Sequence, residues 1–350
     1  MTKPLLQQDL DHIVSHGMRA FFSLKNARIF ITGGTGFFGV WLVESLCYAN
    51  EKLQLNLQIT LLSRCPEKHK KNHPSLFQND IITFLQGDVR DFIFPDEKFT
   101  HVIHAATAAS ATLNASDPLT MLDVIINGTK RTCEMMLQCG AQKNLLVSSG
   151  AVYGRQPPTL PHVSEEYDGF PDAHHAASAY AMGKKAAEHI ALLFSEQRHL
   201  PISIARCFAF VGPHLPLDAH FAIGNFLQDV LLHRDIAIAG DGSPYRSYQY
   251  AADLVIWLLH ILCFGERTVA YNVGSDEAIS ILSLAEMMRQ LSNQSIEIQV
   301  AKKADEKKLA ERYVPSVARA KNKLGLQNTI SLQDAIARTL QWHQIKMELN

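Results

Sequence analysis

The stretch Arg28-Ile-Phe-Ile-Thr-Gly-Gly-Thr-Gly-Phe-Phe-Gly39 decides the fold of this sequence. Residues 28–32 are rich in β-branched and aromatic side chains and predict a strand, and residues 37–48 predict a helix directly after the glycines. Glycine permits a tight turn whose backbone N–H groups can approach a pyrophosphate, and the helix N-terminus adds partial positive charge. The order of strand, glycine turn and helix therefore predicts a dinucleotide-binding turn.

Outward from this turn, strands and helices alternate. Strand-like runs lie at residues 57–63, 81–85, 101–105, 144–149 and 201–206, with helical stretches notably at 118–139 and 178–197. This alternation predicts an α/β fold in which a doubly wound parallel sheet carries helices on both faces.

The pattern becomes less regular after residue 206. Helical stretches at 221–233, 253–264, 281–291 and 331–345 are separated there by short strands and Gly/Pro turns. We expect an amphipathic helical extension over 1–26 and a cofactor-binding domain over 27–206, with a return segment at about 246–264. Residues 207–245 and 265–350 should form a smaller mixed α/β lobe that binds substrate.

Composition limits the classes of partner. The 350 residues are 47% apolar, and 33 Lys and Arg stand against 34 Asp and Glu. Near-neutral charge argues against binding to nucleic acid or to an anionic membrane. The six cysteines form no CxxC pair, and His174-His175 is expected in solvent, so no metal site is expected. Without an apolar leader or a span of about 20 apolar residues, a cytoplasmic location is expected.

The end of the second predicted strand bears on the choice of cofactor. It reads Leu62-Ser63-Arg64-Cys65, and an arginine there suits the 2′-phosphate of NADP, whereas an acidic residue suits NAD. Arg64 therefore favours NADP, with NAD as the alternative. Asp88, after the third strand, is placed to accept from the adenine amino group, although a turn aspartate is the simpler interpretation.

Tyr180-Ala-Met-Gly-Lys184 places a phenol and an ammonium on one face of a helix. The cation, together with a nicotinamide ring, is expected to lower the pKa of the tyrosine, so that it can exchange a proton with a sugar or alcohol hydroxyl. Ser149, at the end of the fifth strand, would polarise the same oxygen. The predicted catalytic residues are Ser149, Tyr180 and Lys184.

In these residues, the sequence resembles an extended short-chain dehydrogenase/reductase of the nucleotide-sugar epimerase/dehydratase family. The resemblance covers about residues 27–345 and rests on residues 32–39, His104-Ala105-Ala106, residues 148–154, residues 180–184, and Gly240-Asp241-Gly242 leading to Arg246. It implies a Rossmann domain that binds NAD(P), a lobe that binds a nucleoside-diphosphate sugar, and often a homodimer.

The expected cofactor contacts are Gly33, Thr35, Gly36, Phe37, Phe38, Gly39, Ser63, Arg64, Asp88, Val89, Ala105 and Ala106, together with Tyr180 and Lys184. The resemblance also implies that Arg246 and Arg312 contact the substrate diphosphate, and that Asn225, Ser149 and Ala151 contact the nucleotide or sugar.

One departure from the family matters for the reaction. Dehydratases of this family carry Asp and Glu directly after the catalytic Ser or Thr, and decarboxylases carry the Glu, whereas this chain has Gly150 and Ala151. Dehydration needs that extra acid/base pair, for which Glu165 or Glu166 could substitute. The sequence therefore predicts a nucleotide-sugar 4-epimerase or 4-keto-sugar reductase. A 4,6-dehydratase is the alternative within the class, and a catalytically silent NAD(P)-binding regulator is the alternative outside it.

Overall fold

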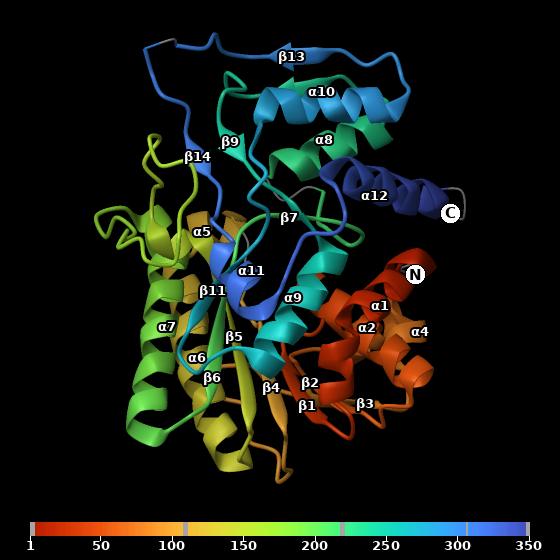
Figure 1. The fold of residues 1–350 in the computed structure, drawn as a ribbon, viewed down its shortest axis with the longest axis vertical. Helices are drawn as coiled ribbons and strands as arrows, with labels where there is room; N and C mark the ends of the chain where they lie inside the picture. The colour runs from red at the N-terminus through yellow and green to blue at the C-terminus, as the bar shows by residue number, and fades with distance from the viewer. Residues whose placement is uncertain (1–3, 108–110, 218–220, 306, 348–350) are drawn as a thin grey trace.

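A seven-stranded parallel sheet forms the centre of the molecule (Figure 1). The structure is a computed structural model and describes residues 4–107, 111–217, 221–305 and 307–347. The strands run in the order β11-β6-β5-β4-β1-β2-β3. Their bounds are β1 (Arg28–Thr32), β2 (Gln58–Ser63), β3 (Ile82–Gln86), β4 (His101–His104), β5 (Lys143–Ser149), β6 (Ile202–Cys207) and β11 (Ala270–Val273). This order, which starts at β1 and winds outward both ways, confirms the predicted Rossmann-type sheet.

Helices cover both faces of the sheet because both faces are apolar. On β1, Ile29 and Ile31 join the core under α2 (Phe37–Leu53) and α9 (Ala251–Phe264), whereas Phe30 joins the core under α6 (Pro118–Cys139) and α7 (Ala179–Arg198). Alternate residues of a strand point to opposite faces, so the side chains of one buried strand belong to the hydrophobic cores on both faces of the sheet. In the part of the chain that the structure describes, no helix has the length and apolar character needed to cross a membrane.

Several elements differ from the sequence-based expectation. The edge strand β11 comes from a stretch that was expected in the smaller lobe. Short helices that were not predicted appear at α3 (Pro66–Asn72), α4 (Pro74–Phe77), α5 (Ala111–Ser116) and α11 (Ala318–Leu324). Runs of four to seven residues are too short to show a helical period in the sequence.

The smaller lobe is mixed α/β, as predicted. Its strands form a three-stranded sheet in the order β12-β9-β14 and the pairs β13-β8 and β10-β7. Their bounds are β7 (Phe210–Val211), β8 (Ile236–Ile238), β9 (Tyr245–Arg246), β10 (Gln249–Tyr250), β12 (Ile279–Ser280), β13 (Ile298–Val300) and β14 (Arg312–Tyr313). The lobe's helices are α8 (Ala222–Leu231), α10 (Ile281–Ser292) and α12 (Leu332–Met347). They lie above the carboxyl ends of the main sheet (Figure 1).

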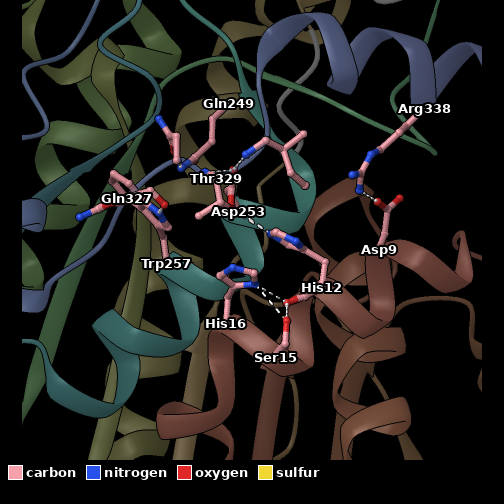
Figure 2. Close-up of polar contacts among 12 residues, drawn as sticks. Asp9, His12, Ser15, His16, Gln249, Asp253, Trp257, Gln327, Thr329 and Arg338 are labelled. Atoms are coloured by element: carbon pink, nitrogen blue, oxygen red, sulfur yellow. Dashed lines mark hydrogen bonds and ion pairs between the residues drawn. The ribbon is translucent and has the colours of Figure 1, made fainter.

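The predicted N-terminal helix is α1 (Gln7–Ser23), which packs against α9 with a buried stripe that includes Leu10, Ile13 and Phe21. Within that stripe lies Asp9, which accepts hydrogen bonds from Tyr250 Oη at 2.6 Å and Arg338 at 2.7 Å. Arg338 belongs to α12, so one carboxylate connects α1 to the far end of the chain (Figure 2).

A second buried carboxylate lies in the same region (Figure 2). Asp253, in the first turn of α9, accepts from the backbone N–H groups of Thr329 and Ile330 at 3.0 and 3.1 Å and from the Thr329 hydroxyl at 2.6 Å. His12 of α1 lies 2.8 Å from the same hydroxyl. The segment before α12 is thereby fastened to α9.

Candidate active site

The glycine turn lies directly against the end of β4. Gly33 has a φ of +76°, and a Cβ atom there would lie 2.6 Å from the Ala105 carbonyl and 2.7 Å from the Ala106 nitrogen. At Gly39 a Cβ atom would lie 2.3 Å from the Gly33 oxygen. Because real Cβ atoms do not approach so closely, only glycine fits at these two positions. The structure therefore brings Gly33, Gly39, Ala105 and Ala106 together, and their contacts with the cofactor stay a prediction.

A buried histidine holds this turn in place. His104 Nδ1 lies 2.8 Å from Thr32 Oγ1, and His104 Nε2 lies 3.1 Å from Thr129 Oγ1 on α6. Thr32 Oγ1 also accepts from the Ala106 N–H at 3.1 Å. Burial lowers the pKa of His104 to about 3, so the ring is neutral at physiological pH. His104 thus connects β1, β4 and α6 around the glycine turn.

The tip of the turn fits a pyrophosphate. Gly36 is the N-cap of α2 and is exposed, and no side chain caps the helix there. Thr35 is half-buried beside it. The N-terminal N–H groups and the helix dipole therefore point to open space where an anion would be stabilised. The ring centroids of Phe37 and Phe38 lie 5.7 Å apart, and the Phe38 ring packs edge-on against the Phe210 ring.

The end of β2 is positively charged. Ser63 is buried, and its hydroxyl accepts from the Cys65 N–H at 3.2 Å. Arg64 is exposed and lines a hollow of about 330 Å³ together with Lys68, Lys70 and Glu67, whose carboxylate accepts from Lys70 Nζ at 3.0 Å. The positive charge of these basic side chains would attract the negatively charged phosphate on a ribose.

Asp88 already has a cationic partner in the chain. Arg90 Nε donates to its carboxylate at 2.8 Å, and this hydrogen bond holds the pKa of Asp88 below its usual range. Val89 is buried against α6, where a Cβ atom on Gly128 would lie 2.8 Å from the valine side chain. The turn after β3 is therefore held on α6. The adenine contact of Asp88 stays a prediction.

The catalytic residues predicted from sequence come from adjacent elements. Ser149 ends β5, and Tyr180 and Lys184 lie in the first two turns of α7. The start of α7 is fixed by Asn114, whose side chain accepts from the Tyr180 N–H at 3.0 Å and donates to the Ala177 carbonyl at 2.8 Å. The phenol of Tyr180 thereby lies near the Ser149 hydroxyl, whose influence lowers the pKa of the phenol.

Lys184 is buried among neutral oxygens. Its Nζ donates to the Val147 carbonyl at 2.8 Å and to Thr107 Oγ1 at 2.7 Å. Burial lowers the pKa of Lys184 to about 8. Because neither partner carries a negative charge, the cation is desolvated without being neutralised.

The pKa of Tyr180 does not follow the sequence-based expectation in the protein alone. Burial raises it above the ordinary value, and the nearby Ser149 hydroxyl opposes that rise only in part. Lys184 donates its hydrogen bonds to Val147 and Thr107, so it is not the main influence on the pKa of Tyr180. A lowered pKa therefore requires a further positive charge beside Tyr180.

A buried polar network, which the sequence did not reveal, connects β5, the strand that ends at Ser149, to the elements packed around it. Ser148 donates to Glu188 at 2.6 Å, and Arg206 donates to both oxygens of that carboxylate. Arg206 also donates to Tyr153 Oη at 2.8 Å, and Tyr153 donates to Asn272 at 2.8 Å. The network joins β5, β6, α7 and β11. The one sequence signal was the spacing of Glu188, one helical turn after the catalytic lysine.

The two arginines predicted to contact the diphosphate lie on paired strands of one small sheet, and their contacts with the substrate stay predictions. In the parallel pairing of β9 and β14, Arg312 is opposite Tyr245, and Tyr313 is opposite Arg246. The Arg312 guanidinium stacks on the Tyr245 ring at 4.4 Å. Neighbouring residues of a strand face opposite sides. Arg312 therefore does not share the face of Arg246, and the residue that does is Tyr313, which the sequence analysis missed.

The other predicted substrate residues are placed as follows. Ala151 adjoins the catalytic serine, because its N–H donates to Ser149 Oγ at 3.2 Å. Asn225 lies half-buried on α8, close in sequence to residues 218–220, which are outside the described part. Among the described residues, no hydrogen bond joins Asn225 to Ser149 or Tyr180, so its predicted contact with the substrate stays a prediction.

Neither of the two loop glutamates that could replace the dehydratase acids is free. Glu165 accepts from the Asn272 N–H at 2.7 Å, and Glu166 accepts from Arg319 at 2.5 Å. Within the described ranges, no carboxylate contacts Ser149 or Tyr180. The pocket thus offers a phenol, a hydroxyl and a cation, but no second acid/base pair.

Comparisons with known proteins agree with this geometry. UDP-glucuronic acid decarboxylase 3 of Arabidopsis thaliana is 28% identical over 319 residues, which cover 90% of this chain and 88% of the relative. The solved structure of a dTDP-glucose 4,6-dehydratase from Streptomyces venezuelae, with NAD and TYD bound, is 20% identical with a TM-score of 0.78, covering 92% of this chain and 98% of that one. A UDP-glucuronic acid 4-epimerase from Bacillus cereus in complex with NAD is 22% identical with a TM-score of 0.75, covering 91% and 99%.

The structural likenesses show a shared fold. Membership is shown by a match of residues 29–274 to a single family model. The matched residues include the glycine turn, the Ser149–Tyr180–Lys184 cluster and the strand of Arg246, and leave out α1. The chain belongs to the NAD dependent epimerase/dehydratase family.

Proposed function

We propose that this enzyme acts at C4 of a nucleoside-diphosphate hexose, as a 4-epimerase or as a 4-keto-sugar reductase. The observation that carries the proposal is the composition of the pocket. Ser149 and Tyr180 meet there without a carboxylate beside them. Transfer of one hydride and one proton at a single carbon needs no further acid/base pair.

The positions after Ser149 support this choice over dehydration. A Cβ atom on Gly150 would lie 2.7 Å from the Phe208 ring, so the pocket as built has no room for a side chain there. Ala151 carries no ionisable group, and Glu165 and Glu166 are bound to Asn272 and Arg319. Elimination of water would require a base and an acid that these contacts do not provide.

Decarboxylation is the second candidate, because curated relatives carry that name. The identity of 28% to UDP-glucuronic acid decarboxylase 3 extends over most of both chains. Loss of carbon dioxide from a 4-keto uronic acid also begins with hydride removal at C4. The missing glutamate at position 151 is the observation against it.

A nicotinamide cofactor held at the glycine turn of Gly33 and Gly39 would supply hydride-transfer chemistry at C4. Tyr180 takes the proton of the C4 hydroxyl as the C–H bond breaks, and Ser149 holds the oxygen in line. Lys184, desolvated one turn away, favours the phenolate by its positive charge. In an epimerase, Tyr180 returns the proton after the keto sugar has turned over. In a reductase, Tyr180 donates a proton to the keto oxygen once.

The cofactor preference forms part of the proposal. The exposed Arg64 with Lys68 and Lys70 around one hollow supports NADP. Related structures contain NAD or NADH, which makes NAD the alternative. Arg246 is proposed to bind the substrate diphosphate. We also propose a homodimer, formed through α6 and α7.

The experiment is a panel of substrates analysed by mass spectrometry and NMR. Purified protein is incubated with UDP-glucose, UDP-galactose, UDP-glucuronic acid, dTDP-glucose and a dTDP-4-keto-6-deoxyhexose, each with NAD, NADP or the reduced forms. An isomer of unchanged mass identifies the epimerase, and gain of two hydrogens from NADPH identifies the reductase. Loss of water or of carbon dioxide would overturn the proposal in favour of the dehydratase or the decarboxylase. Tighter binding of NAD than of NADP would overturn the cofactor preference.

A further inference from the structure

One hydroxyl lies between the lysine of the catalytic pocket and the backbone beside the glycine turn. Thr107, in the segment that follows β4, accepts a hydrogen bond from Lys184 Nζ at 2.7 Å. The Thr107 hydroxyl donates its own proton to the Ala106 carbonyl at 2.8 Å. A threonine hydroxyl has one proton to donate and lone pairs that accept, so these two contacts together fix its orientation. Its accepting side therefore faces the ammonium.

The orientation of the Lys184 ammonium depends on this contact. An ammonium has three N–H donors in a tetrahedral arrangement. One donates to the Val147 carbonyl at 2.8 Å and a second donates to Thr107. Once two of the three directions are fixed, the third is fixed as well. Among the residues that the structure describes, this third N–H has no acceptor, so it is left for a bound molecule.

The backbone on the other side of Thr107 belongs to the cofactor turn. The Ala106 N–H donates to Thr32 Oγ1 at 3.1 Å, and Thr32 directly precedes the first glycine of the turn. A Cβ atom on Gly33 would lie 2.7 Å from the Ala106 nitrogen, so this peptide lies directly against the turn. A continuous path of hydrogen bonds therefore runs from Thr32 through Ala106 and Thr107 to Lys184.

We propose that Thr107 is a positioning residue, which orients the third N–H of Lys184 toward the bound cofactor and connects the lysine to the glycine turn. This inference rests on the proposed function for the role of Lys184. Without the Thr107 hydroxyl, the ammonium keeps one fixed N–H and can rotate about it, so the directions of the other two are no longer set. Cofactor binding should weaken and turnover should slow.

A double substitution separates this role from a purely structural one. If Thr107 acted only by shaping the backbone beside the turn, its loss would weaken cofactor binding equally with and without the lysine. If Thr107 acts through Lys184, its loss matters only while the lysine is present. Non-additivity of the two substitutions is therefore the measurement that decides.

Calorimetric titration with NAD and with NADP tests this without turnover. Thr107→Val keeps the shape of the side chain and should weaken binding of the tighter of the two cofactors about tenfold, the scale of one hydrogen bond to a charged group. In a Lys184→Met background, the same substitution should change binding less than about twofold. Thr107→Ser retains the hydroxyl and should bind as wild type does. Equal weakening in both backgrounds, or no weakening in the presence of Lys184, would overturn the assignment.

Thr100→Val is the matched control, at the opposite end of the same strand. The Thr100 hydroxyl also has two backbone contacts, accepting from the Arg28 N–H at 3.0 Å and donating to the Arg28 carbonyl at 3.1 Å. Loss of this hydroxyl should leave cofactor binding within about twofold of wild type, because it lies outside the path to Lys184. A tenfold loss here as well would count against Thr107. Melting temperatures verify folding, and Thr107→Ala repeats the test if the valine variant does not fold.

Turnover provides the second readout. On an active substrate, Thr107→Val should lower kcat about tenfold with little change in the KM for the sugar, and Thr107→Ser should restore kcat. An unchanged kcat in Thr107→Val would contradict the positioning role. Non-additive cofactor binding without conversion of any substrate in the panel would contradict the proposed function and leave the assignment of Thr107 in place.

Discussion

Two regions of this molecule bury charge, and they do so in opposite ways. In the catalytic pocket, the hydrogen-bond partners of the Lys184 ammonium among the described residues are the Val147 carbonyl and the Thr107 hydroxyl. Under α1, the carboxylate of Asp9 has a cation and a phenol, Arg338 and Tyr250. Burial pushes both groups toward their neutral forms, lowering the pKa of Lys184 and raising that of Asp9.

The difference lies in what each charge still lacks. Asp9 is paired with a counter-charge inside the protein, which suits a permanent structural contact. Within the part of the chain that the structure describes, the hydrogen-bond partners of Lys184 are neutral, so its positive field is available to whatever binds beside Tyr180. Lys184 thus keeps an unpaired charge beside the catalytic groups, whereas the charge of Asp9 is paired with Arg338.

The largest expected effect is that of Tyr180→Phe, which removes the proton-transferring group but keeps the ring. Turnover on any active substrate should fall about a thousandfold, because general acid/base catalysis contributes on this scale. The melting temperature should stay near that of wild type. Turnover equal to that of wild type would instead support a catalytically silent cofactor-binding protein.

Arg338→Met tests the structural half of this comparison, the pairing of the Asp9 carboxylate with a cation. It leaves Asp9 buried without its cation, which should lower the free energy of unfolding by about 2–3 kcal/mol at pH 8. Since burial already raises the pKa of Asp9, acid will protonate the unpaired carboxyl and reduce the loss at pH 5. Chemical denaturation at both pH values measures this. A loss that is independent of pH would mean that Arg338 acts by packing alone.

Lys184→Met should act in the opposite direction on stability. The pKa of Lys184 falls from 10.5 in the unfolded chain to about 8, so the wild-type fold is penalised below pH 8 and recovers as pH rises toward 10.5. The free energy of unfolding of the variant should therefore exceed that of wild type by about 1–3 kcal/mol at pH 7, and the two should be equal above the ordinary lysine pKa. The variant should lose activity. A destabilised variant at pH 7 would show that the hydrogen bonds to Val147 and Thr107 outweigh the desolvation.

Substitution of Glu44 should have the smallest effect on stability. It is buried on α2, accepts from the Leu5 N–H at 2.7 Å, and has its pKa raised by burial from 4.5 to about 7. A carboxyl with a raised pKa costs stability as pH rises from its unfolded pKa of 4.5 to its folded pKa of about 7, and the full cost applies above that value. Glu44→Gln should therefore raise the melting temperature at pH 8, by the equivalent of about 1 kcal/mol, and change it little at pH 5. Equal shifts at both pH values would contradict the assigned protonation.

The sequence was informative where chemistry and local structure coincide. The strand at residues 28–32, the glycine turn and the pair Tyr180 and Lys184 each lie within one or two elements, so their spacing alone predicted their geometry. Tyr313 could not be found this way, because its two-residue strand shows no periodicity and its place depends on register with β9. Likewise, Asp9 meets Tyr250 across 241 residues of chain.

The way α1 covers α9 has a practical consequence for recombinant work. The family match starts at residue 29, which invites shortening the protein to that point. Such a truncation would uncover α9, whose residues from Ala251 to Cys263 are all buried in the full chain. It would also leave Arg338 and Tyr250 without Asp9. Expression of the catalytic domain in a form that does not aggregate therefore requires the first helix, although no predicted catalytic residue lies in it.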